Sequence, residues 1–352
     1  MSFDADHDLA DFVRRFLTTR GAEIEAAGSR FNVLLPAELA GRLGIPEFCT
    51  LNLAGEGQGD VTVQYGRPVL EKMTDAACQR VPFTGLRLNF TYLKSQGFDN
   101  LVREQFSFFN GVVAVSGSAA TLTDYIVLVC RYLLQSDEQK EDLLMLAFNL
   151  ETGAPTDAMA ALLDTVEKRP EPVPGAAAIG ADQLERIQGW VQRRAPVALE
   201  PHLSPFRDSM NRRYQRDVAN LEAYYAGLKT EMEAALTRPG LSEDSIQGRI
   251  EKMGLLSGEL SAKKEDLFKK YSITVQLRLC AALLVRSPAV KVLAGVAVGR
   301  AKKQLTFFYN PVLKALDPAV CAGCGQAAYQ IQFCTRLHLL CRKCAQACPI
   351  CR

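Results

Sequence analysis

Apolar residues in the first 165 positions follow two spacings, which together predict an α+β domain. Residues 4–20 and 68–80 have apolar positions at helical spacing, and Pro68 suits the first turn of the second helix. Short apolar runs predict β-strands at 31–35, 49–53, 61–65, 86–93, 106–115, 125–132 and 143–150. We expect the last four to form an antiparallel meander, so that residues 1–165 make an N-terminal α+β domain with its own core.

A change in composition separates this domain from the rest of the chain. Residues 166–182 are rich in Pro, Ala and Gly, and Pro170, Pro172 and Pro174 exclude a helix there. The segment is therefore predicted to be a linker.

Residues 183–271 have the pattern of a long helical hairpin. Apolar positions recur in steps of three and four on both sides of Pro239-Gly240, and Ser242 is placed to cap the second helix. We expect two antiparallel helices. They either project as an arm or lie flat on their own domain.

The apolar spacing changes from helical to alternating at Ser272. Ile273, Val275 and Leu277 alternate with polar residues, and strand-like runs follow at 290–298 and 304–309. Residues 272–318 are therefore predicted to form a small β-sheet at the base of the helical hairpin.

Charge is divided unevenly along the 352 residues, whose net charge is +2. Residues 1–165 hold 13 Lys/Arg and 22 Asp/Glu, a net charge of −9, whereas the remainder holds 28 and 17, a net charge of +11. The two halves either face each other or the basic half meets an acidic partner. Because the basic residues are spread along the predicted helices, nucleic acid is the less favoured partner.

The chain has the features of a cytoplasmic protein. Its first residues are acidic and lack the apolar run of a signal peptide. The most apolar stretch, 281–299, contains Arg286, Pro288 and Lys291, so we expect no membrane-spanning segment. Four scattered cysteines beside a dense cysteine cluster favour a reducing compartment over a disulfide framework.

Seven of the 11 cysteines lie in the last 32 residues and, with one histidine, form the pattern C-x2-C-x9-C-x3-H-x2-C-x2-C-x3-C-x2-C. Zn²⁺ prefers thiolate and imidazole ligands in tetrahedral groups of four, so eight ligands predict two complete sites. Four protein ligands leave no open position for water or substrate, and both Zn²⁺ ions are therefore predicted to be structural. Residues 319–352 would be a zinc-binding module.

Two pairings of the eight ligands compete. In the sequential scheme the last four cysteines share one ion and crowd the backbone. The interleaved scheme is favoured because it cross-links the segment with itself, so that a short peptide with almost no core can fold. It assigns Cys321, Cys324, Cys341 and Cys344 to site 1, and Cys334, His338, Cys348 and Cys351 to site 2.

The order and spacing of these ligands resemble a RING finger of the C3HC4 kind, whose ligands are shared in a cross-brace. The resemblance covers about a tenth of the chain. It implies an E3-type protein that recruits a charged E2 conjugating enzyme for ubiquitin or a ubiquitin-like protein and has no catalytic residues of its own. It also implies a partner-binding surface that includes Pro349 and Ile350, with Arg352 bridging the E2 enzyme and its ubiquitin.

Two features depart from the RING pattern. An aliphatic residue usually precedes the second cysteine, whereas this chain has Gly323. Only residues 345–347 separate the sixth and seventh ligands, which is too short for the helix that completes the usual docking groove. A degenerate RING, or a zinc ribbon with an added C-x2-C pair, remains an alternative. An iron–sulfur site fits less well because His338 and Cys321 would be unexplained.

A weaker, diffuse resemblance connects residues 31–150 and the helical hairpin with the accessory regions of bacterial Swi/Snf-type helicases. The chain has no nucleotide-binding motif of a motor. The resemblance implies an alternative to the RING-type function: the chain would be a non-enzymatic zinc-ribbon accessory protein of a helicase or another DNA-handling complex. A catalytic histidine is not expected, because His7 and His202 both have the sequence context of surface residues.

Overall fold

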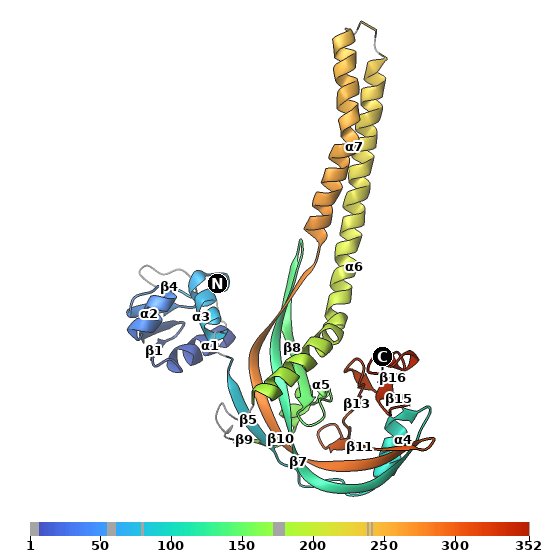
Figure 1. The fold of residues 1–352 in the computed structure, drawn as a ribbon. Coiled ribbons are helices and arrows are strands. Elements are labelled where there is room, and N and C mark those ends of the chain that lie inside the picture. The colour runs from blue at the N-terminus through green and yellow to red at the C-terminus, as the bar shows by residue number, and fades with distance from the viewer. Residues whose placement is uncertain are drawn as a thin grey trace. The chain divides into compact units, whose positions relative to one another are not determined.

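The computed structural model describes residues 7–54, 61–78, 81–171, 180–237, 239–240 and 242–351. The chain divides into two compact units, Met1–Pro82 and Phe83–Arg352. The sequence-based boundary at residue 165 falls inside the second unit. Each unit combines helices with a largely antiparallel sheet, as the α+β prediction states (Figure 1).

The first unit is a small sheet covered by three helices. Its sheet has the order β1-β2-β3-β4, with β1, β2 and β3 antiparallel and β4 parallel to β3. Apolar side chains of the helices and strands form one core, which includes Val13, Leu17, Phe31 and Met73. The elements are α1 (His7–Thr18), β1 (Glu23–Ala27), β2 (Arg30–Leu34), α2 (Ala37–Leu43), β3 (Phe48–Asn52), β4 (Val61–Thr62) and α3 (Pro68–Cys78).

The second unit is built on one long, curved sheet (Figure 1). Its strands are β5 (Phe83–Leu88), β7 (Val112–Gln135), β8 (Gln139–Asn149), β9 (Lys168–Glu171), β10 (Thr274–Val298), β11 (Ala301–Asn310) and β12 (Ala315–Leu316). Two short helices, α4 (Phe98–Gln105) and α5 (Asp157–Leu162), pack on it. The strand β9 lies within the predicted linker, of which residues 172–179 are outside the described residues.

Pairing between β7 and β10 is the main departure from the sequence-based picture. The two strands are antiparallel from Gln135↔Thr274 to Val112↔Ala297, with bulges near Cys280 and Ser116. The predicted strands 106–115 and 125–132 are therefore largely one strand. Residues 274–310 complete the sheet begun by β7 and β8 instead of forming a separate small sheet. Periodicity within a segment indicates a strand but does not specify a partner more than a hundred residues away.

The predicted helical hairpin is formed by α6 (Ala181–Leu236) and α7 (Glu243–Tyr271). The first part of α6 packs on the sheet, where Ile187, Leu199 and Phe206 meet the buried face of β7 and β8. Three prolines lie in this part, and each removes a helical hydrogen bond, which accounts for the bend of α6 seen in Figure 1. Ser242 caps α7 by accepting a hydrogen bond from the Ser245 amide.

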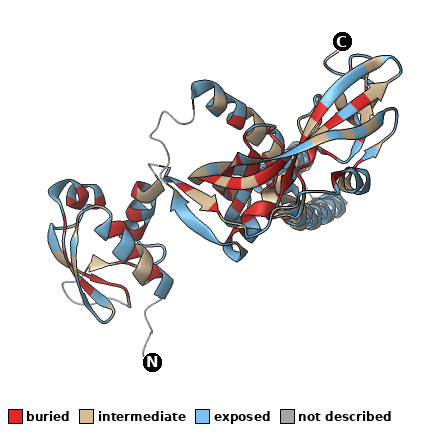
Figure 2. Cartoon of the chain, turned by 90° about the horizontal axis from the view of Figure 1, so that it is seen from below, coloured by how far each residue is buried: buried red, intermediate tan, exposed pale blue. Residues whose placement is uncertain are grey.

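At the base of the hairpin, Tyr214 and Leu267 still pack on the core of the sheet, and Arg213 pairs with Glu138 in the β7–β8 turn. Farther out, the described residues of the two helices pack against each other. None of the described residues between 211 and 270 is buried, although the apolar stripe is half-buried along the seam. Figure 2 shows the buried residues of this unit gathered in the sheet and its neighbours, whereas the long helices are mainly exposed. The hairpin therefore projects as an arm instead of lying flat.

The C-terminal segment packs on the sheet and shares its core. It contains β13 (Ala319–Val320), β14 (Ala327–Ala328), β15 (Gln330–Phe333), β16 (Leu339–Cys341) and the 3-10 turn η3 (Cys344–Gln346). Ile331, Phe333 and Leu340 are buried together with Phe98 and Phe307 of α4 and β11. The segment also pairs in parallel with β6 (Ser107–Phe108).

A reciprocal pair of hydrogen bonds extends this contact. The side-chain amide nitrogen of Asn110 donates to the Phe333 carbonyl at 2.7 Å, and the backbone N–H of Phe333 donates to the Asn110 side-chain oxygen at 2.8 Å. The expectation of an almost coreless peptide held by metal alone is thus wrong in one respect. The ligand-bearing segment has apolar side chains of its own, and it buries them against the scaffold.

Candidate metal centre

Short strands and tight turns bring the eight predicted ligands into two groups. Site 1 contains Cys321 and Cys324 from the turn after β13, Cys341 from the end of β16, and Cys344 from η3. Site 2 contains Cys334 after β15, His338 before β16, and Cys348 and Cys351 from the C-terminal turn. Within each group, the ligand atoms all lie within 4.8 Å of one another. These are the two groups of the interleaved scheme.

Distances at both sites match a tetrahedral zinc ion. With Zn–S near 2.3 Å and Zn–N near 2.0 Å, tetrahedral geometry requires S···S of about 3.8 Å and S···N of about 3.5 Å. The Cys324 and Cys341 sulfurs are 3.8 Å apart, and those of Cys334 and Cys351 are 3.6 Å apart. Each group of four therefore fits a metal ion of the size and ligand preference of zinc.

His338 faces site 2 through Nδ1. This nitrogen lies 3.3 Å from the sulfurs of Cys334 and Cys351, and 3.6 Å from that of Cys348. The turn that presents it is closed by the Leu337 amide, which donates to the Cys334 carbonyl at 2.9 Å. Leu337 has a positive φ of 57°, a strained conformation for a residue with a side chain, and its side chain is buried in the core below.

Backbone amides prepare one thiol in each group for ionisation. Burial opposes ionisation of Cys321, but the amides of Cys341, Cys324 and Gly323 outweigh it and lower the pKa of this thiol to about 7. At site 2, burial again opposes ionisation, and the amides of His338 and Arg336 lower the pKa of Cys334 to about 6.

Neighbouring thiols have the opposite effect on the remaining ligands. Burial and the side chains of Cys334 and Cys348 raise the pKa of Cys351 to about 11. Burial and the site 1 thiols also raise the pKa of Cys344 strongly. Clustered thiols cannot all ionise in the absence of a cation, and a divalent ion removes this competition. The donor sets are therefore chemically suited to a metal ion.

Gly323 has a steric reason for being glycine. A β-carbon at this position would lie 2.8 Å from Cγ of Pro349 and 3.1 Å from the Cys344 sulfur. The turns at 321–324 and 348–351 therefore press against each other here, and Pro349 occupies the space beside the Gly323 backbone. Pro349 and Ile350 are exposed, Ile350 at 43%. Arg352, the third predicted partner-binding residue, lies outside the described residues.

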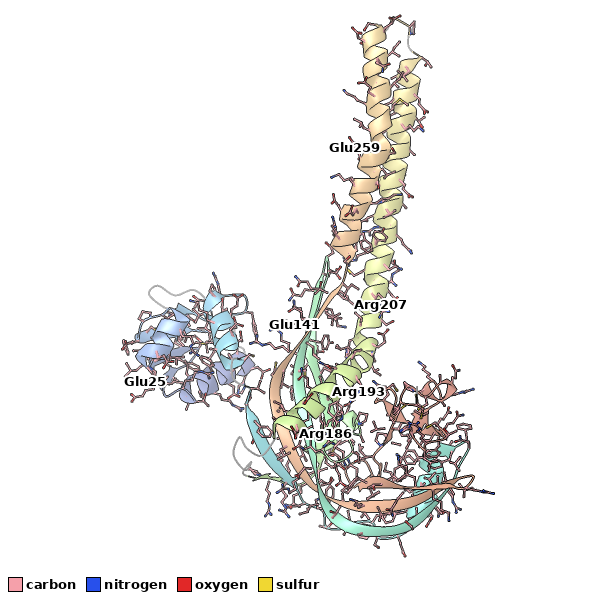
Figure 3. All side chains as sticks on the ribbon, viewed as in Figure 1. Glu25, Glu141, Arg186, Arg193, Arg207 and Glu259 are labelled. Atoms are coloured by element: carbon pink, nitrogen blue, oxygen red, sulfur yellow. The ribbon has the colours of Figure 1, made fainter. Side chains whose placement is uncertain are left out.

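The long helix α6 contacts the loop of site 1. Arg193 lies in the first part of α6 (Figure 3). The Gln326 side chain donates a hydrogen bond to the carbonyl of Arg193, and the Arg193 side chain covers Gly325 so closely that no β-carbon would fit. Gly325 also has a positive φ of 72°. Sequence reasoning missed this contact because nothing in the local pattern of α6 distinguishes Arg193 from other exposed arginines.

A buried polar cluster beside the metal-binding segment was also missed. Asp317 is almost fully buried and accepts hydrogen bonds from Tyr125, Asn149 and Asn310 at 3.0, 2.9 and 3.3 Å. Burial raises the pKa of Asp317 to about 6, although the three hydrogen bonds act to lower it. The Asn310-Pro311 and Asp317-Pro318 pairs are typical of loops, and that was the only indication in the sequence.

Within the described residues, the two groups above are the only clusters that could hold a metal ion. The other histidines are not part of them, and the His202 ring packs 5.1 Å from that of Tyr132. None of the described helices is both long enough and apolar enough to span a membrane. No family model matches the sequence, and no curated protein matches it.

Proposed function

We propose that the protein is a RING-like zinc adaptor that recruits a conjugating enzyme charged with ubiquitin or a ubiquitin-like protein. The observation that carries this proposal is the interleaved grouping of the eight ligands, in which each site takes its members from two separated parts of the segment. This is the cross-braced arrangement that the resemblance implies. The distances between ligand atoms support Zn²⁺ as the ion at both sites.

Zinc at these sites would hold the module together and would not act on a substrate. Four protein ligands complete a tetrahedral shell and leave no position for a water molecule or a carbonyl oxygen. Any transfer reaction would therefore use the reactive thioester of the bound enzyme. The adaptor would supply proximity and orientation, which can contribute several kcal/mol to a rate.

The surface offered to the conjugating enzyme would be centred on Pro349 and Ile350. Both residues are exposed, and Pro349 lies against Gly323, the position that carries an aliphatic side chain in the family. The chain thus has the part of the expected surface formed by Pro349 and Ile350. It lacks the aliphatic side chain at position 323 and the helix between the sixth and seventh ligands. A contact this small suits a weak, transient interaction. Arg352 would add the bridge to the transferred protein.

The first unit and the arm would select the target. The arm beyond Met210 includes 26 residues of α6, so it reaches about 39 Å at 1.5 Å per residue. Half-buried apolar side chains along its seam, and the exposed Tyr224 and Leu255, offer contact area far from the metal centres. A target held by the arm would be separated from the transfer site by this length.

The test is a discharge assay with zinc-loaded protein and a panel of charged conjugating enzymes from the source genome. We expect faster loss of the thioester with at least one of them, and a return to the background rate with Ile350→Ala or Pro349→Ala. Leu255→Ala is the matched control, because it removes an exposed aliphatic side chain from the arm. If no enzyme in the panel responds to protein that carries two zinc ions, the proposal fails.

A further inference from the structure

Basic residues dominate the end of the second unit that carries the metal centres. Between Ser272 and Cys351 the chain has ten Lys/Arg and a single acidic residue, Asp317. Asp317 is 2% exposed and hydrogen-bonded on both carboxylate oxygens, so it offers no negative charge to the surface. Seven thiolates and two Zn²⁺ would contribute −3, which leaves this region with a net positive charge.

Five of these side chains define what we call the basic surface. They come from the turn between β10 and β11, from β11, and from the two loops that flank β16, and they are Arg300, Lys303, Arg336, Arg342 and Lys343. All five residues are exposed. Among the described residues, none of the five forms an ion pair with an Asp or a Glu.

Contacts between the two segments bring these charges together. The Lys303 ammonium donates to the carbonyl of Leu337, the residue after Arg336, at 3.2 Å. A β-carbon on Gly111 would meet Val298 at 3.1 Å and the Phe333 ring at 3.2 Å, so the end of β10 lies beside the end of β15. The turn with Arg300 and the loop with Arg336 are therefore neighbours, although the sequence separates them by 36 residues.

An exposed aromatic side chain lies beside β15, the strand that leads into the loop with Arg336. Phe109 is 59% exposed, and its amide donates to the Ile331 carbonyl at 3.0 Å, which places it beside β15.

We propose that the basic surface binds single-stranded nucleic acid, with phosphates at Arg300, Lys303 and Arg336 and a base stacked on Phe109. Unneutralised cations match the charge of a phosphate backbone, and an exposed ring beside them is the second element that single strands use. A duplex keeps its bases stacked and gains nothing from Phe109. The proposal is independent of the RING-like function and holds whether or not a conjugating enzyme binds.

The test is fluorescence anisotropy with labelled 20-nucleotide oligo-dT and oligo-U, repeated from 50 to 300 mM salt. The triple variant Arg300→Gln/Lys303→Gln/Arg336→Gln should bind at least tenfold more weakly. Its slope of log K against log salt should be shallower by about 2, since each lost phosphate contact on a single strand contributes about 0.7. Phe109→Ala should weaken binding about fivefold or more without changing that slope.

The matched control carries the same loss of charge on the arm, in Arg212→Gln/Lys229→Gln/Lys252→Gln, and should bind like the wild type. Each variant must retain two zinc ions, so that a loss of binding reports the surface and not the fold. The proposal is overturned if the wild-type protein does not bind at 50 mM salt, or if the two triple variants behave alike. It is also overturned if a blunt duplex binds more tightly than the single strand, or if only anionic lipid vesicles or an acidic peptide bind.

Discussion

The phenol of Tyr125 on β7 donates a hydrogen bond of 3.0 Å to the buried carboxylate of Asp317, 192 residues later in the chain. Asn149 and Asn310 donate to the same carboxylate, so the ends of β8 and β11 meet there as well. This cluster joins the sheet to the segment that leads into the metal centres. Among the described residues, the hydrogen-bond partners of this carboxylate are all uncharged.

The pH dependence of stability should reveal this carboxylate. The pKa of Asp317 is raised by burial to about 6 in the folded protein, against 3.8 for the ordinary side chain. Because the folded pKa is raised, the protonated Asp317 carboxyl stabilises the folded state. This contribution to the unfolding free energy is fully present below pH 3.8 and is lost as the pH rises through 6, by about 3 kcal/mol in total. We expect the difference in unfolding free energy between the wild type and Asp317→Asn to shift in this direction between pH 4.5 and 7.5.

The measurement is chemical denaturation of both proteins with saturating zinc at each pH. Effects of acid on the metal centres cancel in the difference between the two proteins. A difference that stays constant across the range would contradict the assignment of the raised pKa to Asp317.

Zinc stoichiometry should distinguish the two pairing schemes. Cys321 and Cys344 belong to the same site in the interleaved scheme and to different sites in the sequential one. The double variant Cys321→Ser/Cys344→Ser should therefore retain one zinc ion per chain, whereas sequential pairing predicts none. Cys344→Ser/Cys348→Ser gives the reverse expectation, because interleaved pairing predicts no zinc and sequential pairing predicts one. Native mass spectrometry reads both results directly.

Glycine at position 323 should be required for site 1. In Gly323→Ala the new methyl group would press on Pro349 and on the Cys344 sulfur, at 2.8 and 3.1 Å before relaxation. We expect a loss of about 1–3 kcal/mol in stability and faster release of one zinc ion to a chelator.

Gly258→Ala on α7 is the matched control, because its β-carbon would meet nothing within 4 Å. That change should leave zinc release unaltered and stabilise the helix by up to about 1 kcal/mol. Equal zinc release from the two variants would argue against the steric role of Gly323.

The arm should be separable from the rest of the second unit. Glu222 of α6 and Lys264 of α7 face each other in an ion pair, so these two positions lie opposite each other along the hairpin. Removing residues 223–262 and joining the ends through a short Gly-Asn turn should preserve both zinc ions and shift Tm by only a few degrees. The far-ultraviolet helical signal should fall in proportion to the residues removed. A collapse of the sheet, seen as loss of cooperative unfolding, would contradict this.

Local patterns in the sequence were sufficient for some features of the structure. The helices α6 and α7 follow an apolar stripe, and the turn and the Ser242 cap between them depend on adjacent residues. The grouping of ligands could be inferred because metal chemistry restricts spacing and number. Both kinds of inference need only residues that are close in sequence, or a ligand set that must be complete.

Other features depend on contacts between distant segments and could not be inferred. Pairing of β7 with β10 and the docking of Phe333 on Asn110 join residues that are more than 130 positions apart. The beginning of α6 carries Pro196, Pro201 and Pro205, which oppose helix formation locally. Burial of its apolar face on the sheet compensates for them, and that burial exists only in the assembled unit.

The pairing of β7 with β10 sets an order for assembly during synthesis. The ribosome makes β7 and β8 first, but β10 follows only after the whole arm, 125 or more residues later. Until then, one long edge of β7 has no strand to pair with, and the nascent chain exposes it. The arm, which can close into a hairpin by local contacts alone, would shorten the effective distance between the waiting strand and its partner. A feature that looks like a binding appendage in the finished protein would thus also speed its completion.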